Sequence, residues 1–331
     1  MPVKSVTMHD VARLAGVSVI TVSRALSDPA RVSPQTLKRV EDAVAQTSYV
    51  PNLMAGGLRS SRSRLVVALV PTLAGQLFTS AVQSLTRSLE SHGYQLILGQ
   101  IGYADSREDK LLDAIVGRRP DGIVLTGILH SAEWRRRLIA SGIPVVETWD
   151  YTPTPIDMLV GFSHERVGRE VCEYLAKRGR RRLAVMGADD ARAHQRQESF
   201  VRTAVRLGLS PPQVEVVPAP ATHAAGRQAL AAALAKRRAF DGVFCSSDML
   251  AMGVMTEARV RGIDVPGKLS VVGFGDLDFA ATLDPALTTV HIDGTRLGEL
   301  AAQYIVDRAE GKDIAEPVVD IGFRIVARAS A

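Results

Sequence analysis

The sequence predicts an α/β protein in which an N-terminal three-helix helix-turn-helix domain precedes a two-lobed domain of doubly wound parallel sheets. Three observations support this prediction. Capping residues delimit three short helices near the start of the chain, and positive charge is concentrated in the same stretch. From residue 65 onward, short β-branched runs alternate with helical stretches. Such alternation is typical of parallel sheets with helices on both faces.

Length and composition set the broad class. With 331 residues, 46% of them hydrophobic, the chain is long enough for two or three domains with a large core. No apolar run approaches the roughly 18 residues of a membrane helix, and the opening MPVKSVTMHD lacks the apolar region of a signal peptide. Cys172 and Cys245 lie in apolar stretches, so we interpret them as core residues rather than a disulfide. We therefore expect a cytoplasmic protein with no membrane partner.

Charge is unevenly distributed along the chain. Residues 1–64 hold nine Lys and Arg and four acidic residues, so nine minus four accounts for the whole net charge of +5. The remaining residues balance at 31 against 31. A basic head on a neutral body indicates that only the head meets a polyanion. A solvated basic surface would give the same count, so charge alone leaves both interpretations open.

Capping residues define the first two helices of the head. Thr7 is a good N-cap for a helix over about 8–15, with an acidic residue at its N3 position, and Gly16 ends that helix. Ser18 then caps a second helix over about 19–26. A helix, a turn that contains glycine and a second helix make the helix-turn-helix motif. In that motif the second helix enters the major groove of DNA with its N-terminus first.

A third helix completes the head. Ser33 and Pro34 are the cap and first position of a helix that extends to about Thr47. Leu37, Val40 and Val44 repeat at helical spacing and form its core face.

The second helix holds the candidate base contacts. Arg24 has the geometry for a bidentate contact to guanine, whereas Val19 and Ile20 can only touch thymine methyl groups or exclude wrong bases. The small hydroxyl side chains nearby suit phosphate contacts, which position the helix. The predicted DNA-binding residues of the head are Thr7, Ser18, Val19, Ile20, Thr21, Ser23 and Arg24.

The head also matches the pattern of a known family. The runs MHDVARLAGVSVITVSRALSDPARVSPQT and VEDAVAQTSYVPN resemble the lactose repressor/galactose repressor (LacI) family of transcription regulators. A three-helix bundle of this length is equally compatible with a protein-binding module, but the basic charge and these residues favour DNA. The resemblance implies palindromic operator DNA as a partner, and a homodimer that reads its two half-sites.

Residues 51–64, PNLMAGGLRSSRSR, have the polar, basic and Gly/Ser-rich composition of an interdomain linker. The resemblance implies that this hinge becomes helical on operator DNA, where the two hinges of a dimer wedge Leu58 into the minor groove beside Ala55. Asn52 is the third predicted DNA contact of the hinge. Gly56 and Gly57 each cost a helix about 1 kcal/mol relative to Ala, so we expect the hinge to fold only when DNA and the partner hinge support it.

The body contains enough strands for two lobes. The predicted strands are Leu65–Val70, Tyr94–Leu98, Gly122–Thr126, Pro144–Thr148, Leu183–Met186, Gly242–Cys245, Leu269–Phe274 and Thr288–His291, with a last strand near Phe323–Ala327. The predicted helices are Leu77–Ser91, Glu165–Lys177, Arg196–Leu207, Ala224–Lys236 and Met249–Val260. We expect a head over 1–50, a hinge over 51–64 and a body over 65–331, with one lobe over about 65–162 and 293–319 and the other over about 163–292 and 320–331.

The resemblance extends over the body. DGIVLTGILH, GIPVVE, VGFSHE, FDGVFCSSDMLAMG, LSVVGFGD and ALTTV are similar to segments of the family's effector domain, which is itself similar to periplasmic sugar-binding proteins. TLAGQLF, SHGYQL and DIGF resemble the gluconate operon repressor subgroup. The resemblance therefore implies a periplasmic-binding-protein-like effector domain that holds a small molecule between its lobes.

The family's effector contacts can be carried over position by position. They predict an effector site of Gln76, Leu77, Phe78, Thr126, His130, Glu147, Trp149, Asp150, Phe162, Arg196, Ser247, Asp248, Gly275 and Asp276. Ser247 and Gly275 stand where the family commonly has an amide and a carboxylate that neutral sugars use. Arg196 is then less countered, which favours a sugar acid such as gluconate or 2-ketogluconate, because Arg binds carboxylate through two hydrogen bonds. An ordinary surface or capping role is the alternative for each residue.

The body shows no enzyme signature. It has no G-x-G-x-x-G after its first strand, no P-loop and no G-x-S-x-G, and its dispersed His residues lack metal-ligand spacing with a Cys. We therefore predict a DNA-binding regulator of carbohydrate metabolism, expected to be a repressor, without catalytic residues, cofactor or metal. Two alternatives remain open: the same family with a neutral-sugar or nucleobase effector, and a metabolic enzyme fused to a DNA-binding head.

Overall fold

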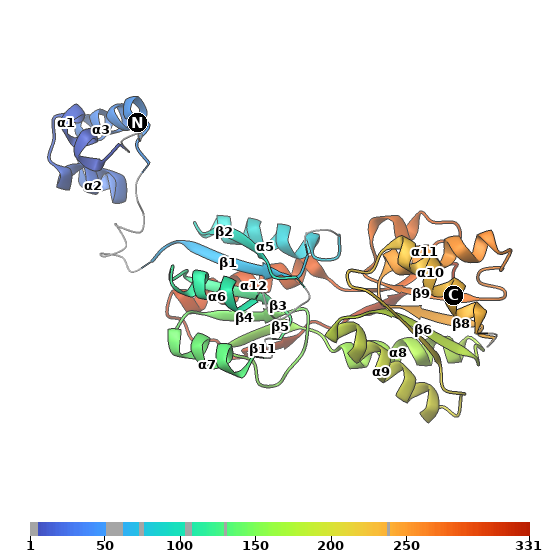
Figure 1. Cartoon of the computed structure of the whole chain (residues 1–331). Coiled ribbons are helices and arrows are strands. Elements are labelled where there is room, and N and C mark those ends of the chain that lie inside the picture. The colour runs from blue at the N-terminus through green and yellow to red at the C-terminus, as the bar shows by residue number, and fades with distance from the viewer. Residues whose placement is uncertain (1–5, 51–61, 73–75, 103–107, 129–130, 237–238) are drawn as a thin grey trace. The chain divides into compact units, whose positions relative to one another are not determined.

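The computed structural model describes residues 6–50, 62–72, 76–102, 108–128, 131–236 and 239–331. The chain forms two compact units, Met1–Ser63 and Arg64–Ala331 (Figure 1). None of the described helices is long and apolar enough to cross a membrane. The predicted hinge contacts Asn52, Ala55 and Leu58, and the predicted effector contact His130, lie outside the described residues.

The N-terminal unit is a bundle of three helices, as the capping residues predict. These are α1 (Met8–Ala15), α2 (Val19–Ser27) and α3 (Pro34–Thr47), with the 3-10 turn η1 (Pro29–Arg31) before the last. Val11, Val22 and Val40, one from each helix, are fully buried and close a small core. The core is apolar only on the inner face of each helix, as helical spacing requires.

The caps of α1 fix its two ends. The carboxylate of Asp10 accepts hydrogen bonds from the amide (3.0 Å) and the hydroxyl (2.7 Å) of Thr7, which starts the helix. Gly16 ends it with a φ of 63°, the left-handed conformation that glycine adopts without steric cost.

The first lobe of the body is a six-stranded parallel sheet. Its strands, in spatial order, are β11 (Val318–Asp320), β5 (Met158–Gly161), β4 (Val145–Thr148), β3 (Gly122–Thr126), β1 (Leu65–Val70) and β2 (Gln95–Gln100). Helices α5 (Thr79–Ser91) and α12 (Gly294–Ala309) cover one face, and α6 (Glu108–Val116) and α7 (Ala132–Ser141) cover the other (Figure 1). Strand β1, LVVALV, lies between β3 and β2 and is buried on both faces, which explains its unbroken apolar sequence.

The second lobe has a second six-stranded sheet. Its strands, in spatial order, are β12 (Arg324–Val326), β10 (Thr288–His291), β9 (Ser270–Phe274), β8 (Gly242–Cys245), β6 (Leu183–Ala188) and β7 (Gln213–Val217). Helices α8 (His164–Lys177) and α9 (Ala191–Arg206) cover one face, and α10 (His223–Ala235) and α11 (Asp248–Val260) cover the other. The 3-10 turn η3 (Asp278–Ala281) follows β9.

The fold class agrees with the prediction, but several elements differ. Strand β12 pairs antiparallel with β10, so the second sheet is not purely parallel. Three strands were not predicted from the sequence: β5 has only four residues, β11 has three, and β7 is a partly exposed edge strand without a continuous apolar run. The sequence analysis also missed α6, α7 and α12. In α7, three consecutive arginines interrupt the apolar pattern.

The lobes are joined by three crossings of the chain. The chain passes from the first lobe to the second after β5, returns after β10, and crosses again between β11 and β12. Phe162 and Ser163, between β5 and α8, form the first of these crossings. The segment is fixed by backbone contact on the first-lobe side, because a Cβ added to Gly161 would lie 1.8 Å from the carbonyl oxygen of Asp150.

Helices α8 and α9 are in equally close contact. A Cβ added to Gly168 of α8 would lie 2.0 Å from the carbonyl oxygen of Arg196 in α9. Backbone atoms cannot yield as a flexible side chain can, so only glycine fits at this position. The contact therefore fixes the depth at which α9 lies against α8.

The substitution Gly168→Ala tests this contact. We expect it to force the two helices apart and to lower the free energy of unfolding by about 1–3 kcal/mol, the usual cost of overpacking. Arg169→Ala, at an exposed position of the same helix, is the matched control. Urea denaturation of both variants measures the effect, and equal stability of the two would contradict the close packing.

Candidate functional site

Helix α2 presents two exposed side chains that differ in chemistry. Ile20 is 64% exposed, and Arg24 is exposed on the same helix. Val19 differs from the expectation, because it is only partly exposed and packs against the core of the bundle. Ser18 and Thr21 are partly occupied in capping the helix, since the Thr21 amide donates to the Ser18 hydroxyl at 3.1 Å.

Arg24 also differs from two other arginines of this unit in its ion pairing with the described residues. Arg13 and Arg31 form ion pairs with Asp10 (2.7 Å) and Asp28 (2.8 Å). Among the residues that the structure describes, Arg24 forms no such pair. Its guanidinium group is therefore available for an external acceptor.

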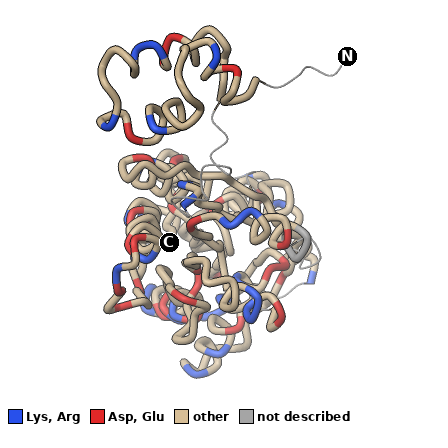
Figure 2. The backbone as a smooth tube through the Cα atoms, turned by 90° about the vertical axis from the view of Figure 1, so that its left-hand side faces the viewer, with Lys and Arg blue, Asp and Glu red and all other residues tan. Residues whose placement is uncertain are grey.

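The turn between α1 and α2 is held by an arginine that the sequence analysis did not single out. Nη2 of Arg39, in α3, donates to the carbonyl oxygens of Ala15 (2.5 Å) and Gly16 (2.9 Å). These carbonyl groups lie at the C-terminus of α1, where a positive charge is favourable. Arg39 thus fixes the turn that sets the direction of α2. Figure 2 shows the Lys and Arg of this unit interspersed with its acidic residues.

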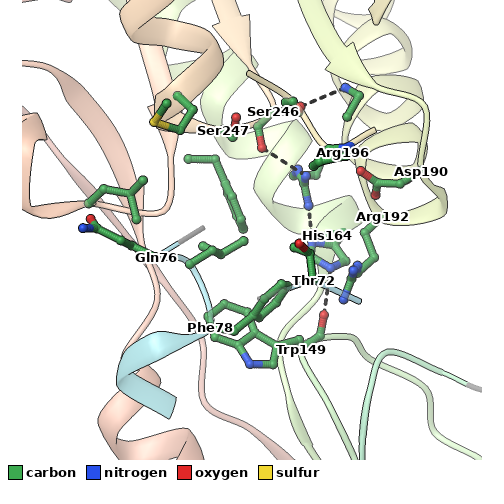
Figure 3. A pocket seen from close by; sticks show the side chains of 17 residues that line it. Thr72, Gln76, Phe78, Trp149, His164, Asp190, Arg192, Arg196, Ser246 and Ser247 are labelled. Atoms are coloured by element: carbon green, nitrogen blue, oxygen red, sulfur yellow. Dashed lines mark hydrogen bonds between the residues drawn. The ribbon is translucent and has the colours of Figure 1, made fainter. Parts of the chain in front are cut away.

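In the C-terminal unit, a cavity of about 110 Å³ lies between the two lobes. Its walls are formed by residues at or just after the carboxyl ends of β1, β4, β5, β6, β7, β8 and β9, the edge at which ligands bind in such sheets. The lining residues are Thr72, Gln76, Leu77, Phe78, Trp149, His164, Ala188, Asp190, Arg192, Arg196, Pro220, Ala221, Ser246, Ser247, Met249, Phe274 and Leu277 (Figure 3).

Arg196 is the most buried charge in this cavity, with an exposed fraction of 5%. Its Nη1 donates to Nδ1 of His164 at 2.9 Å, and its Nη2 donates to the carbonyl oxygen of Ser246 at 3.3 Å (Figure 3). Its guanidinium carbon lies 4.2 Å from the centre of the Phe274 ring, a cation–π contact. These contacts orient the guanidinium group at the cavity wall.

His164 is held neutral by its surroundings. Burial lowers the pKa of its imidazole well below the ordinary value of 6.5, and the positive charges of Arg196 and Arg192 lower it further. Nε2 of the ring lies 2.9 Å from the carbonyl oxygen of Trp149. The neutral ring can donate one hydrogen bond and accept another.

Arg192 is a second cationic group that the sequence analysis missed. It precedes Arg196 by four residues on α9, and residues at this spacing lie on one helix face. Its guanidinium carbon lies 5.6 Å from the centre of the Phe78 ring, which belongs to the other lobe. Its Nη1 is buried and has no hydrogen-bond partner among the described residues. The spacing from Arg196 was the signal that could have identified it.

The cavity has an aromatic back wall. The ring centres of Phe78 and Trp149 are 5.1 Å apart, and Trp149 and Phe162 are 6.0 Å apart, both in edge-to-face geometry. Phe162 in turn packs against His164 at 4.8 Å. Phe162 is fully buried behind this wall and does not line the cavity, in contrast to the expectation.

Two predicted carboxylates point elsewhere. Glu147 is fully buried, accepts a hydrogen bond from the Ile156 amide at 2.8 Å and lies 3.6 Å from Nη1 of Arg135. Asp150 accepts from the Tyr151 amide at 2.8 Å and faces a separate depression outside the cavity. Thr126 ends β3 and is not among the described lining residues.

Asp248 and Asp276 support the second lobe from behind the cavity. The carboxylate of Asp248 accepts from the Thr289 hydroxyl at 2.5 Å and from the Leu277 amide at 2.7 Å. Asp276 contacts His291 at 2.9 Å and Arg328 at 2.6 Å. Neither aspartate lines the cavity. Gly275 also lies beside it, since a Cβ there would approach the Leu77 side chain to 3.1 Å.

Of the effector contacts expected from sequence, six therefore line the cavity: Gln76, Leu77, Phe78, Trp149, Arg196 and Ser247. The polar lining residues that were not expected are Thr72, His164, Asp190, Arg192 and Ser246. A helix-turn-helix head and a two-lobed body with a polar cavity between its sheets define the class of DNA-binding regulators with a ligand-binding body.

Comparison with known proteins identifies the family. The model for the lacI family of bacterial regulatory proteins matches residues 7–52. The model for a periplasmic binding protein-like domain matches residues 172–331. The HTH-type transcriptional regulator GntR of Pseudomonas aeruginosa is 36% identical over 326 residues, which cover 98% of this chain and 95% of that protein. The regulator IdnR of Escherichia coli is 30% identical, with 97% of each chain covered.

A solved structure agrees. The crystal structure of a LacI-family transcriptional regulator from Silicibacter pomeroyi has a TM-score of 0.92 and 33% identity, and covers 98% of this chain and 99% of that one. The chain therefore belongs to the lacI family of bacterial regulatory proteins and is a DNA-binding transcription regulator. The curated relatives are transcription regulators rather than enzymes.

A pH-dependent stability term is expected from Asp248. Burial raises the pKa of its carboxyl to about 6, and the charge of Asp276 adds to the increase. The folded protein binds the Asp248 proton more tightly than the unfolded chain does. This contribution to stability is fully present below the unfolded pKa of about 3.9 and is lost as the pH rises through the folded pKa of about 6. Asp248→Asn should therefore gain stability relative to wild type between pH 4 and 7. Urea denaturation across this range measures the difference. The exposed Asp278→Asn is the control, and parallel curves for Asp248→Asn and wild type would exclude the effect.

Proposed function

We propose that this regulator is an operator-binding repressor of carbohydrate-metabolism genes and that its effector is a sugar acid such as gluconate or 2-ketogluconate. The observation that carries the effector assignment is the pair Arg192 and Arg196, which line one cavity from one face of α9. A neutral-sugar or nucleobase effector within the same family is the alternative.

The charge balance of the cavity supports a monoanion. Among its described lining residues, Arg192 and Arg196 are positive, Asp190 is negative and His164 is held neutral. The carboxylate of Asp190 also caps α9, since it accepts from the Ala193 amide at 2.9 Å. One carboxylate on the ligand would therefore balance the remaining positive charge, whereas a neutral sugar would leave it uncompensated in a desolvated site.

Arg192 adds a second argument. A buried donor without a hydrogen-bond partner costs about 1–3 kcal/mol, and Nη1 of Arg192 is such a donor among the described residues. A carboxylate oxygen of the ligand would remove this cost. Charge-assisted hydrogen bonds to arginine are also stronger than those between neutral groups.

Neutral polar groups in the same cavity suit the hydroxyls of a sugar acid. Thr72 and Gln76 lie on the first-lobe side, and Ser246 and Ser247 lie on the second-lobe side (Figure 3). The edges and faces of Phe78 and Trp149 give the C–H face of a sugar chain an apolar surface. A ligand with a carboxylate at one end and hydroxyls along its length would contact both lobes.

We propose that the regulator acts as a homodimer on palindromic operator DNA, with Leu58, Ala55 and Asn52 of each hinge in contact with the minor groove. The edge strand β2 supports self-association. Ile97 and Leu98 on this strand are 49% and 41% exposed, and apolar edge strands are usually covered in soluble proteins. A two-fold axis through a palindrome places the same strand of each subunit in equivalent surroundings.

The DNA-reading proposal is tested at Arg24. Arg24→Ala should weaken operator binding by roughly 1–3 kcal/mol and relax the preference at one base pair of each half-site, because a bidentate guanine contact is lost. Arg31→Ala, whose arginine is paired with Asp28 outside α2, is the matched control. Binding to operator variants and to random DNA is measured in parallel. Equal loss on both would show that Arg24 contacts only phosphate.

The effector proposal is tested at the arginine pair. Arg192→Ala and Arg196→Ala should each weaken gluconate or 2-ketogluconate binding by about 1.5–3 kcal/mol, the value of a charged hydrogen bond. Arg206→Ala, on the same helix but outside the cavity, is the matched control. Calorimetry with both sugar acids, ribose, galactose and purines measures the selectivity. Binding of a neutral compound by wild type in preference to the acids would overturn the assignment.

A further inference from the structure

His164 occupies the position where the chain enters the second lobe. It is the first residue of α8, two residues after Phe162 in the crossing that follows β5. The ring is 2% exposed and lines the effector cavity. The Ser163 hydroxyl, which accepts from the Arg166 amide at 3.1 Å, starts the helix and fixes this position.

The two ring nitrogens of His164 have different partners. Nδ1 lies 2.9 Å from Nη1 of Arg196, and Nε2 lies 2.9 Å from the carbonyl oxygen of Trp149. An arginine can only donate and a carbonyl can only accept. Nδ1 must therefore accept and Nε2 must carry the proton, so the neutral Nε2–H tautomer is the one state that satisfies both bonds.

Close backbone contacts hold the segments that carry Arg196 and Trp149, the two partners of the His164 ring. The Arg196 backbone is in contact with Gly168, and the segment after Trp149 is in contact with Gly161 at the Asp150 carbonyl. Trp149 has a φ of 59°, which is uncommon for a bulky residue, and packs against Phe78 of the first lobe. The His164 ring therefore bridges the Arg196 guanidinium group of the second lobe and the Trp149 carbonyl group of the first lobe.

We propose that His164 is the positioning residue that couples the effector carboxylate on Arg196 to the junction between the lobes. This inference rests on the proposed sugar-acid effector. The carboxylate draws the Arg196 guanidinium group toward the cavity, and the bond to Nδ1 links that motion to the Trp149 carbonyl. An effector changes operator binding only through different affinities for two arrangements of the body, and this hydrogen-bonded chain spans the junction at which they differ.

Two amide substitutions separate the two ends of this chain. In His164→Asn, the side-chain oxygen can take the place of Nδ1 and still accept from Arg196, but nothing reaches the Trp149 carbonyl. In His164→Gln, the longer side chain can place its amide nitrogen near the position of Nε2 and donate to Trp149, but the acceptor for Arg196 is lost. The pair therefore distinguishes positioning of Arg196 from coupling to the first lobe.

The experiment measures sugar-acid binding by calorimetry, and the ratio of operator Kd with and without the acid, in the full-length protein. His164→Asn should retain binding within about tenfold but bring the operator ratio close to one, from the 5- to 150-fold typical of allosteric coupling. His164→Gln should weaken sugar-acid binding by about tenfold or more, because a charge-assisted hydrogen bond that orients Arg196 is lost. A wild-type operator ratio in His164→Asn, or equal losses of both properties in the two variants, would overturn the proposal.

A measurement on the unmodified protein is independent of how the variants fold. Nitrogen-15 NMR of the imidazole should show the neutral Nε2–H tautomer of His164 at pH 6, and an Nδ1–H tautomer or a protonated ring would overturn the proposal. Failure of the effector assignment is distinguishable, because wild type would then bind neither sugar acid. If wild type binds and responds while His164→Asn responds equally, the coupling role alone is wrong.

Discussion

The burial of the Arg196 guanidinium group constrains the arrangement of the whole cavity. A charge that is 5% exposed needs partners on every side, and the fold supplies a neutral imidazole, a backbone carbonyl and an aromatic face. The imidazole must stay neutral to accept, which the lowered pKa of His164 ensures. Each partner comes from a different element: His164 from α8, Ser246 from the end of β8 and Phe274 from the end of β9. The position of one charge thus depends on the packing of one helix and two strands of the second lobe.

The glycine contacts explain why this packing is rigid. Gly168 allows α8 and α9 to approach until backbones touch, and Gly161 does the same for β5 and the segment after β4. The backbones that carry Arg196 and Asp150 are therefore positioned by direct backbone contact. A rigid frame of this kind favours two discrete arrangements of the lobes over a continuous range, because close-packed interiors transmit displacement rather than absorb it.

Sequence reasoning predicted the local features well and the distant ones less well. The caps at Thr7, Gly16 and Ser18 depend on adjacent residues only, so the bounds of the first three helices follow from the sequence within a residue or two. Glu147 and Trp149 are two residues apart, so strand alternation alone would place both side chains on one face. Trp149 lies just after the end of β4, and its φ of 59° redirects the chain, so Trp149 lines the cavity while Glu147 and Asp150 do not. That conformation could not be read from residue types. Arg192 was readable from helical spacing, whereas Ser246 and Phe274 join the site only through the order of strands in the second sheet.

Most of the net positive charge of residues 1–64 lies outside the folded three-helix bundle. Within residues 6–50 the basic residues Arg13, Arg24, Arg31, Lys38 and Arg39 meet the four acids Asp10, Asp28, Glu41 and Asp42, so the folded bundle is close to neutral. Two of those arginines are ion-paired and Arg39 is held at the turn. The excess positive charge therefore lies in the flanks, at Lys4, Arg59 and Arg62, and at Arg64, whose guanidinium group lies over the Tyr94 ring of the C-terminal unit. Non-specific attraction to phosphates depends on the number of cations that contact the backbone, so it should come mainly from the flanks. The proposed base contacts are then confined to the few exposed side chains of α2. Under the proposed hinge contacts, an effector that altered the hinge would change the electrostatic part of binding together with those contacts, without any change in the fold of the head.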